Sequence, residues 1–411
     1  MDMSIPPRVS TKLSSTPSQY GSVEQTNIPS SSDMGAAGHS QTAISTPPTP
    51  STPPAPQEKP DHGQRIETDQ NIKAGKYSGS SHISSLPPLP SSDAKLFASA
   101  LPAGCHFVEA TAYGSSLWTQ TAKITAVSDA GEECAFFLKT ASGELGEAMF
   151  KGEFEGMSAI HQTMPDFSPK PIAWGRCTDT TDLFFFLSAF VRMDQGHIPD
   201  VGKLCAKLAK MHRESVSPTG QFGFHVTTCN GNIPQNNTWN ESWEVFFSNG
   251  LRYMLALDVK VNGEQPELVE AMQPIFDCVI PRLLGPLEQG PNRIRPALVH
   301  GDLWFGNCST NLDTDEPVIF DAAAFYAHNE YELGNWRPAR NLLNTAHLDV
   351  YKTLNPPCHP AAEFEDRIML YEIRFNLHFC ILLSGLKDTK KEMILNMNYL
   401  ANKYPLKESK G

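Results

Sequence analysis

A short stretch in the second half of the chain carries side chains that could transfer a phosphoryl group. Residues 298–307 read LVHGDLWFGN, which places Asp302 and Asn307 five residues apart. Asp321 follows the apolar run Val318–Phe320. Phosphoryl transfer needs a carboxylate that orients or deprotonates the attacking hydroxyl, and oxygen ligands that hold Mg²⁺ against the phosphates. The Asp-to-Asn spacing is that of a kinase catalytic loop, so it predicts Asp302 as the base, with Asn307 and Asp321 as the Mg²⁺ ligands. Each residue alone also fits an ordinary turn or strand end; only the whole set favours a kinase.

A kinase site also needs a strand lysine that contacts the phosphates and a helix glutamate that holds it. Lys139 ends the apolar stretch 136–139, which reads FFLK. The helix expected over Gly146–Met164 contains Glu153. Glu147 is the alternative partner on the same segment, but Glu153 lies deeper in the helix, so we expect Lys139 to pair with Glu153.

Two further segments are candidates for contacting the nucleotide. Residues 113–116 read YGSS, and Gly114, Ser115 and Ser116 form the candidate loop over the phosphates, through backbone N–H groups and the two hydroxyls. Ser188 and Phe190 lie where the strand Leu183–Val191 ends. In a two-lobed kinase this is the hinge that meets adenine; here the assignment rests on order along the chain alone.

The elements that must position these residues follow from apolar periodicity. Strands are expected over Phe107–Tyr113, Thr121–Val127, Cys134–Leu138 and Leu183–Val191, and helices over Gly146–Met164 and Val201–Arg213. The remainder is mainly helical, including Phe364–Tyr404, with a short strand at Val318–Phe320. This order indicates an α+β, protein-kinase-like fold with a small β-rich N-terminal lobe and a larger α-rich C-terminal lobe.

Composition divides the chain into three parts. Residues 1–95 contain 14 of the 33 prolines and no Phe, Trp or Cys, so they cannot bury enough apolar surface to fold and are expected to form a disordered Pro/Ser/Thr-rich tail. Residues 96–190 are expected to form the nucleotide-binding lobe, and residues 191–411 the catalytic and substrate lobe.

Charge and cysteine content limit the partners and the compartment. The net charge of −12 argues against a nucleic-acid partner, because phosphate backbones select basic surfaces. The longest apolar run, Leu183–Val191, is too short to cross a bilayer, which takes about 20 residues, and the N-terminus lacks a signal-peptide pattern. The nine cysteines show no zinc-ligand spacing. A cytoplasmic protein with reduced thiols is expected.

Three segments together resemble the fructosamine kinase family, also called ketosamine-3-kinases or protein-ribulosamine 3-kinases. They are the loop LVHGDLWFGN, the stretch PVIFDAAAFYAHNEYELG over Pro317–Gly334, and FGFHVTTCNGNIPQNNTWNESW, which starts at Phe222. The resemblance covers roughly residues 96–405. Aminoglycoside or choline kinases would share the His-Gly-Asp and Asn residues, but not Trp304 or the other two segments.

The resemblance implies the aminoglycoside-phosphotransferase variant of the kinase fold and an ATP- and Mg²⁺-dependent reaction. The acceptor would be the 3-hydroxyl of a ribulosamine or fructosamine on a small amine or a protein lysine, and the product would release the amine. Asp302 would then act as base. Trp304 would pack against the sugar or its amine, with loop packing as the alternative. His328 and Glu330 are substrate candidates, since a carboxylate there could meet the cationic amine.

Two other interpretations stay open at this point. A kinase of the same fold acting on a different hydroxyl would keep every phosphotransfer residue and differ only in its acceptor pocket. A non-catalytic relative would have lost the base, a metal ligand or the lysine, and all of these are present. The sequence does not decide between ribulosamine and fructosamine, between a free and a protein acceptor, or among oligomeric states.

Overall fold

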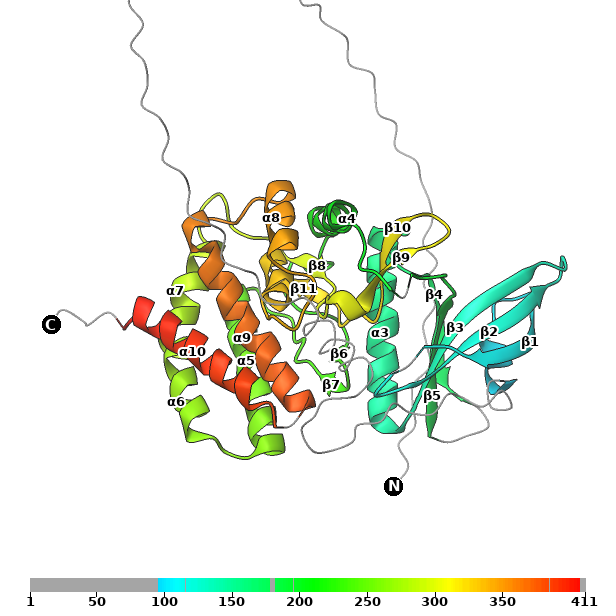
Figure 1. Cartoon of the computed structure of the whole chain (residues 1–411), viewed down its shortest axis with the longest axis horizontal. Coiled ribbons are helices and arrows are strands. Elements are labelled where there is room, and N and C mark those ends of the chain that lie inside the picture. Colours follow the sequence, from blue (N-terminus) through cyan, green and yellow to red (C-terminus); the bar gives the residue numbers. More distant parts are fainter. Residues whose placement is uncertain (1–94, 115, 178–181, 195, 384, 407–411) are drawn as a thin grey trace, which may run out of the picture. The chain divides into compact units, whose positions relative to one another are not determined.

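The computed structural model describes residues 95–406, except 115, 178–181, 195 and 384 (Figure 1). The segment expected to be a disordered tail lies outside the described residues apart from Lys95, and Ser115 also lies outside them. The expected order of a small β-rich lobe followed by a larger α-rich lobe is confirmed.

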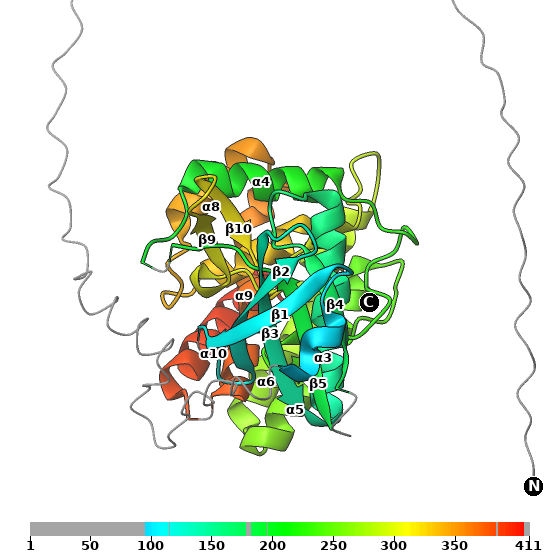
Figure 2. The same cartoon turned by 90° about the vertical axis from the view of Figure 1, so that its right-hand side faces the viewer.

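The β-rich lobe is built on one antiparallel sheet of five strands, which Figure 2 views from the sheet side. Their spatial order is β1-β2-β3-β5-β4. The strands are β1 (Cys105–Ala112), β2 (Gln120–Ser128), β3 (Glu133–Ser142), β4 (Pro171–Arg176) and β5 (Leu183–Ala189). The four strands predicted in this region are confirmed, while β4 was not predicted. Ile124, Leu138 and Leu187 are buried in the core of the sheet.

Helix α3 (Gly143–Thr163) lies against this sheet and carries Glu153. It presents Phe150, Met157 and Ile160 inward, the helical spacing seen in the sequence. Two of its glycines let it approach the α-rich lobe. A Cβ on Gly152 would lie 2.5 Å from the carbonyl oxygen of Thr227, and one on Gly156 would lie 3.1 Å from the Ala324 side chain. The helix therefore fixes Glu153 relative to the chain that follows Asp321.

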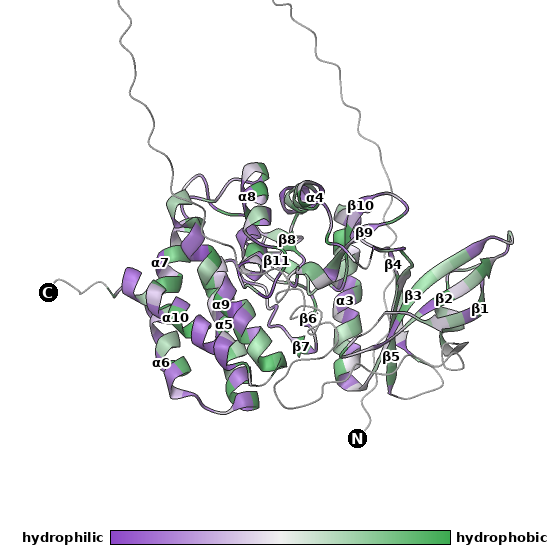
Figure 3. Cartoon of the chain, in the orientation of Figure 1, coloured by the Kyte–Doolittle hydropathy of each residue, from purple (hydrophilic) through white to green (hydrophobic). Residues whose placement is uncertain are grey.

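The α-rich lobe is a helical layer around small two-stranded sheets. Its α-helices are α4 (Val201–Glu214), α5 (Trp243–Asn262), α6 (Pro266–Pro274), α7 (Ile280–Leu284), α8 (Thr345–Leu354), α9 (Phe364–Leu382) and α10 (Lys387–Lys403). In Figure 3, α9 and α10 carry both hydrophobic and hydrophilic residues. Helix α9 lies at the centre of the lobe, with Ile368, Tyr371 and Phe375 almost fully buried. The helices predicted over Val201–Arg213 and within Phe364–Tyr404 are confirmed.

The α-rich lobe contains three strand pairs, and two of them hold the loops that carry the candidate catalytic residues. The three pairs are β6 (Cys229–Asn230) with β7 (Ile233–Pro234), β8 (Ala297–Val299) with β11 (Phe325–Ala327), and β9 (Cys308–Asn311) with β10 (Glu316–Ile319). The strand predicted over Val318–Phe320 corresponds to β10. Residues 300–307 connect β8 to β9 and residues 320–324 connect β10 to β11, so the pairing of these strands brings both loops together.

Neither a membrane-spanning helix nor a disulfide bond is found among the described residues. No described helix combines the length and the apolar character that crossing a bilayer requires. All nine cysteines lie in the described part of the chain, and each is a free thiol there.

Candidate active site

Buried groups hold the loop that carries Asp302 in place. Gly301 has φ +79°, and a Cβ there would overlap the carbonyl oxygen of Ala323, so only glycine fits this turn. The buried Glu332 carboxylate accepts the backbone N–H groups of His300 at 2.5 Å and Gly301 at 3.2 Å. No sequence pattern predicts this bracing role for Glu332, whose nearness to Asp321 groups it with His328 and Glu330 as a possible partner of the acceptor's amine.

His300 links this loop to the strand that precedes Asp321. Its Nε2 lies 2.8 Å from the carbonyl oxygen of Phe320, and the side chain is buried. Burial lowers the pKa of His300, with Glu332 acting in the opposite direction. The imidazole is therefore held as a structural hydrogen-bonding group between the two loops.

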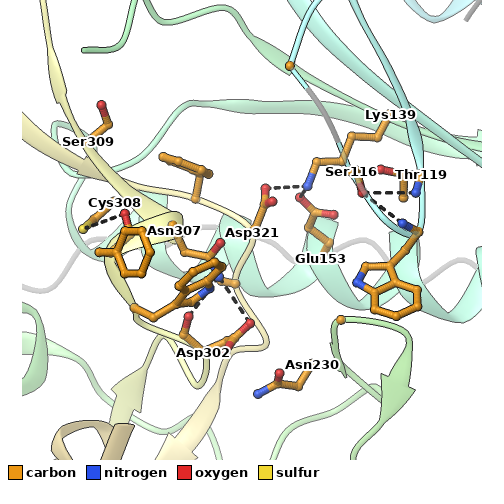
Figure 4. A pocket seen from close by; sticks show the side chains of 18 of the residues that line it. Ser116, Thr119, Lys139, Glu153, Asn230, Asp302, Asn307, Cys308, Ser309 and Asp321 are labelled. Atoms are coloured by element: carbon orange, nitrogen blue, oxygen red, sulfur yellow. Dashed lines mark hydrogen bonds and ion pairs between the residues drawn. The ribbon is translucent and has the colours of Figure 1, made fainter. Parts of the chain in front are cut away.

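Asp302 and Asn307 reach the same site, as their spacing predicts, and there they face each other across the loop (Figure 4). The amide nitrogen of Asn307 donates to the backbone oxygen of Asp302 at 2.9 Å and to Oδ2 at 3.2 Å. This leaves the carbonyl oxygen of Asn307, the atom that can bind a metal, for another partner. Burial raises the pKa of Asp302 to about 8; Arg374 lowers it, while Glu332 and Asp321 raise it. A raised pKa suits a carboxylate that takes up a proton.

Lys139 lies between two carboxylates that are remote in sequence. Its Nζ is 2.7 Å from Oε1 of Glu153 and 2.5 Å from Oδ1 of Asp321 (Figure 4). Glu147 is exposed on the same helix, so Glu153 is the contact that the structure forms. Burial alone would lower the pKa of Lys139, but Asp321 and Glu153 raise it above its ordinary value. Burial raises the pKa of Glu153 to about 7, although Lys139 opposes this shift.

Asp321 reaches Lys139 through an uncommon backbone conformation. Its φ is +60°, a left-handed value that Asp tolerates better than most side chains. The side chain is 43% exposed. Residues in such conformations cluster at functional sites, and here the turn directs the carboxylate toward the cleft (Figure 4).

A cavity of about 950 Å³ joins these groups to the β-rich lobe. Among its lining residues are the predicted site residues Gly114, Ser116, Lys139, Glu153, Ser188, Phe190, Asp302, Trp304, Asn307 and Asp321. The structure therefore brings the predicted phosphate-loop, hinge, lysine and catalytic-loop positions to one cavity.

The loop between β1 and β2 differs in detail from a simple phosphate cradle. The Ser116 hydroxyl accepts the backbone N–H groups of Trp118 at 3.2 Å and Thr119 at 3.1 Å (Figure 4), so these two donors shape the loop itself. The Tyr113 ring packs edge-on against the Phe190 ring, with the ring centres 4.8 Å apart. This contact joins the loop to the hinge.

Trp118 extends this loop across the cavity to the α-rich lobe. A Cβ on Gly231 would lie 3.2 Å from the indole nitrogen of Trp118 and 3.3 Å from Leu382. All three residues line the cavity. The sequence did not single them out, because they come from segments that meet only in the folded chain.

The prediction that His328 and Glu330 contact substrate is wrong for this structure. Both are almost completely buried and neither lines the cavity. The Glu330 carboxylate forms a two-point ion pair with Arg367, at 2.7 and 3.0 Å. His328 Nδ1 lies 2.9 Å from the Tyr371 hydroxyl. Strand β11 begins four residues after Asp321, and its side chains are buried in the core. Sequence proximity to Asp321 therefore does not bring His328 and Glu330 into the cleft.

Glu330 and His328 form, with Cys358, a group whose potential ligand atoms lie within 4.8 Å of one another. Such a group resembles a metal site in composition. The guanidinium of Arg367 already occupies both oxygens of Glu330, and a cation placed beside Arg367 would be repelled. The group is therefore structural: Glu330 forms a buried ion pair with Arg367, and His328 and Cys358 lie beside it.

Glu330→Gln should destabilise the fold without weakening acceptor binding. The substitution leaves the buried Arg367 charge without its counter-charge, which costs about 3 kcal/mol of unfolding free energy. Denaturant unfolding measures this loss, and steady-state kinetics should give an unchanged Michaelis constant for the acceptor. A raised Michaelis constant with unchanged stability would restore the substrate role.

His328 should make the fold less stable in mild acid. Burial lowers its pKa to about 4; Glu330 opposes this shift, whereas Arg367 and His212 support it. Because an unfolded histidine titrates near pH 6.5, the unfolded chain takes up the proton first as pH falls, and stability declines from about pH 6.5 toward pH 4. At pH 5, the loss of unfolding free energy due to His328 is about 2 kcal/mol.

Unfolding at pH 8 and pH 5 tests this assignment. His328→Gln should lose less stability between the two values than the unsubstituted chain does. His197, whose side chain is 84% exposed, supplies the control: His197→Gln should keep the full pH dependence. An identical loss in the His328 variant and the unsubstituted chain would refute the assignment.

The sequence of this chain is similar to that of known sugar-amine kinases. Residues 113–400 match the family model described as fructosamine kinase. A chloroplastic protein-ribulosamine 3-kinase of Oryza sativa subsp. indica is 34% identical over 231 residues, which cover 52% of this chain and 62% of the relative. The corresponding Arabidopsis thaliana protein is 33% identical over 277 residues, covering 65% of this chain and 76% of the relative.

A more distant relative and a solved structure extend the comparison. The ketosamine-3-kinase of Mus musculus is 29% identical over 288 residues, covering 64% of this chain and 87% of the relative. A crystal structure of a candidate fructosamine-3-kinase from Thermobifida fusca superposes with a TM-score of 0.59 at 18% identity, covering 75% of this chain and 98% of that chain. The structural likeness supports the fold, and the family rests on the sequence matches.

Proposed function

The chain belongs to the fructosamine kinase family, and from this premise we propose that it is an ATP-dependent ketosamine 3-kinase. It transfers the γ-phosphoryl group of ATP to the sugar 3-hydroxyl of a ribulosamine or fructosamine adduct. The observation that carries the proposal is the meeting of Asp302, Asn307, Asp321 and Lys139 at one cavity. The names of the relatives supply the class of acceptor.

Asp302 acts as the base in this reaction. The acceptor oxygen forms a bond to the γ-phosphorus, the bond from that phosphorus to the β,γ-bridging oxygen breaks, and the hydroxyl proton passes to Asp302. The hydrogen bond from Asn307 to Oδ2 of Asp302 keeps the carboxylate oriented. ADP leaves with the electron pair of the broken bond.

The donor set of the cavity fits Mg²⁺. Asp321 offers carboxylate oxygens and Asn307 an amide oxygen, which are the ligands that Mg²⁺ accepts besides water and phosphate oxygens. Bound there, the ion would neutralise charge on the phosphates. Lys139, supported by Glu153, contacts the phosphates; its salt bridge to Asp321 shows that the lysine and the proposed metal ligand face the same space.

The nucleotide and the acceptor occupy different parts of the cavity in this proposal. Residues 96–190 form the nucleotide lobe, where Ser188 and Phe190 meet adenine and the loop at Gly114–Ser116 covers the phosphates. Residues 191–411 form the catalytic and substrate lobe, where the indole of Trp304 packs against the sugar or its amine.

The proposed consequence of the reaction is removal of the sugar. A 3-phosphorylated ketosamine is unstable and releases its amine, so the enzyme would repair glycated amines or protein lysines. A cytoplasmic location of the protein is consistent with its nine free thiols. Fractionation of cells that express the tagged chain tests this location.

An acceptor panel tests the function. The chain with ATP and Mg²⁺ is offered a ribulosamine of lysine, a fructosamine of lysine, an aminoglycoside and choline, and phosphate transfer is followed by mass. Transfer to either ketosamine supports the proposal, and the better acceptor identifies the preferred sugar. Transfer only to the aminoglycoside or choline would assign a different hydroxyl, and loss of nucleotide binding would indicate a non-catalytic relative.

A further inference from the structure

Asn230 places a buried amide at the wall of the cavity. It ends strand β6 and is 1% exposed, and it lines the cavity together with Asp302 (Figure 4). Its Oδ1 accepts no hydrogen bond from any described residue. A buried carbonyl oxygen without a donor is costly. The oxygen is therefore placed to accept a hydrogen bond from a molecule bound in the cavity.

The catalytic loop fixes the orientation of this amide. Nδ2 of Asn230 donates to the carbonyl oxygen of Gly301 at 3.3 Å, and Gly301 directly precedes Asp302 in the chain. Because a carbonyl oxygen only accepts, the amide nitrogen must face Gly301 and Oδ1 must face away from it. This bond ties Asn230 to the backbone beside the proposed base, so a donor a few bonds from the reacting hydroxyl is within reach of Oδ1.

Helix α9 and the β-rich lobe hold the hairpin that carries Asn230. Nε2 of His378 lies 2.9 Å from the backbone carbonyl oxygen of Asn230. Burial lowers the pKa of His378 to about 3, so the imidazole is neutral and donates this bond. Trp118 and Leu382 pack against Gly231, the next residue of the hairpin. The amide is thus held in place before a ligand binds, and the neutral imidazole adds no positive charge beside it.

The charge of the cavity favours a cationic donor. A ketosamine carries a basic secondary amine three bonds from the carbon of its 3-hydroxyl, and this amine can bear a proton. Because opposite charges attract, an acidic cavity favours the protonated amine over a neutral sugar hydroxyl. Acidic side chains outnumber basic ones among the described residues that line the cavity: Glu153, Asp194, Asp302 and Asp321 against Lys139 and Arg340.

We propose that Oδ1 of Asn230 accepts a hydrogen bond from the protonated amine of the ketosamine, so that Asn230 selects sugar adducts of amines over the same sugars without an amine. This inference rests on the proposed ketosamine kinase function and adds a specificity-determining residue to it. It assigns to Asn230 the contact that His328 and Glu330, buried outside the cavity, do not make. The sugar then lies between the amide and Asp302, with its 3-hydroxyl at the base.

A matched pair of acceptors tests the inference. One is the ketosamine of lysine that the chain phosphorylates better; the other is its ether analogue, in which oxygen replaces the nitrogen that carries the sugar and cannot donate. The unsubstituted chain should show a kcat/KM about 10- to 100-fold higher for the amine, as expected for a hydrogen bond to a charged group. Asn230→Leu removes the amide oxygen and should lower this ratio by about tenfold or more. Asn230→Asp should keep the ratio, since a carboxylate oxygen also accepts from a cation.

The ratio separates binding of the amine from support of the loop. Loss of the bond from Nδ2 to Gly301 should lower kcat/KM for both acceptors by the same factor. Asn237→Leu is the control, because Asn237 also donates from its amide, to Val226 and Thr228, but is not among the lining residues of the cavity. Its variant should keep the ratio. Asn230→Ala removes the same oxygen with less bulk and gives the same comparison if the leucine variant does not fold.

Equal losses for the amine and the ether in Asn230→Leu would show that the side chain only supports the loop or binds a sugar hydroxyl, and would overturn the inference. Equal kcat/KM for the two acceptors in the unsubstituted chain would overturn it as well, whatever the variants do, and would leave the kinase function standing. Transfer to neither acceptor would overturn the kinase function and the inference together.

Discussion

Asp302→Asn should lower kcat for phosphate transfer to a ketosamine by roughly 10²- to 10⁴-fold, the range expected for loss of a positioned general base. Asparagine has nearly the same shape and can stay beside Asn307, but it cannot take the proton of the attacking hydroxyl. Nucleotide affinity should remain within about twofold, because the predicted nucleotide contacts are made by other residues. Steady-state kinetics together with titration of a nucleotide analogue measure both quantities.

Asp313→Asn is the control for Asp302→Asn. Asp313 is an exposed aspartate on the β9–β10 turn that pairs with Arg192, and its substitution should leave kcat unchanged. A thermal melt of each variant separates lost chemistry from lost folding. Full activity of a folded Asp302→Asn variant would remove Asp302 from the reaction.

Asp321→Asn should reduce phosphate transfer by about 10³-fold, since several kcal/mol of metal-dependent charge stabilisation depend on a charged ligand. The amide keeps an oxygen but loses the negative charge that pairs with Lys139 and that we propose binds Mg²⁺. The Mg²⁺ concentration needed for half-maximal activity should rise. Nucleotide binding measured without Mg²⁺ should not weaken, because a negative charge near the phosphates is removed.

Asp315→Asn is a closely matched control for this substitution. Asp315 and Asp321 are the non-glycine residues with positive φ in the described part of the chain, at +57° and +60°. Asp315 instead pairs with Lys203 at the surface. Its variant should keep both kcat and the Mg²⁺ requirement. An unchanged Mg²⁺ dependence in Asp321→Asn would contradict the assignment of Asp321 as a metal ligand.

Much of the fold could be predicted because its elements have clear local patterns. Helix α3 shows apolar residues on one face, and β5 is a continuous apolar run. Strand β4 was missed because PIAWGR begins with proline and contains glycine, both unfavourable for a strand. It forms at the edge of the sheet by pairing with β5, and that pairing is set by the tertiary fold.

The candidate site could be predicted where its residues lie in one sequence motif or follow one another in the order that the kinase fold requires. The spacing of Asp302 and Asn307 predicted that both reach one site, where the structure places them in contact, and the helix position of Glu153 predicted its contact with Lys139. For His328 and Glu330, nearness to Asp321 in sequence misled, because β11 turns the following residues into the core. Arg340 lines the cavity and contacts Asn376 of helix α9, a contact between segments that are distant in sequence.

Release of the free amine from a glycated substrate tests the central claim most directly. Lysine carrying a ribulosamine or a fructosamine is incubated with the chain, ATP and Mg²⁺, and the adduct, its phosphorylated form and free lysine are followed by mass, with Asp302→Asn in parallel. The account predicts a phosphorylated adduct whose 3-oxygen carries the phosphate, followed by free lysine, and both products formed at least about 100-fold more slowly with the variant. ATP turnover or phosphate transfer to another position, with the ketosamine left intact at its 3-hydroxyl, would contradict it.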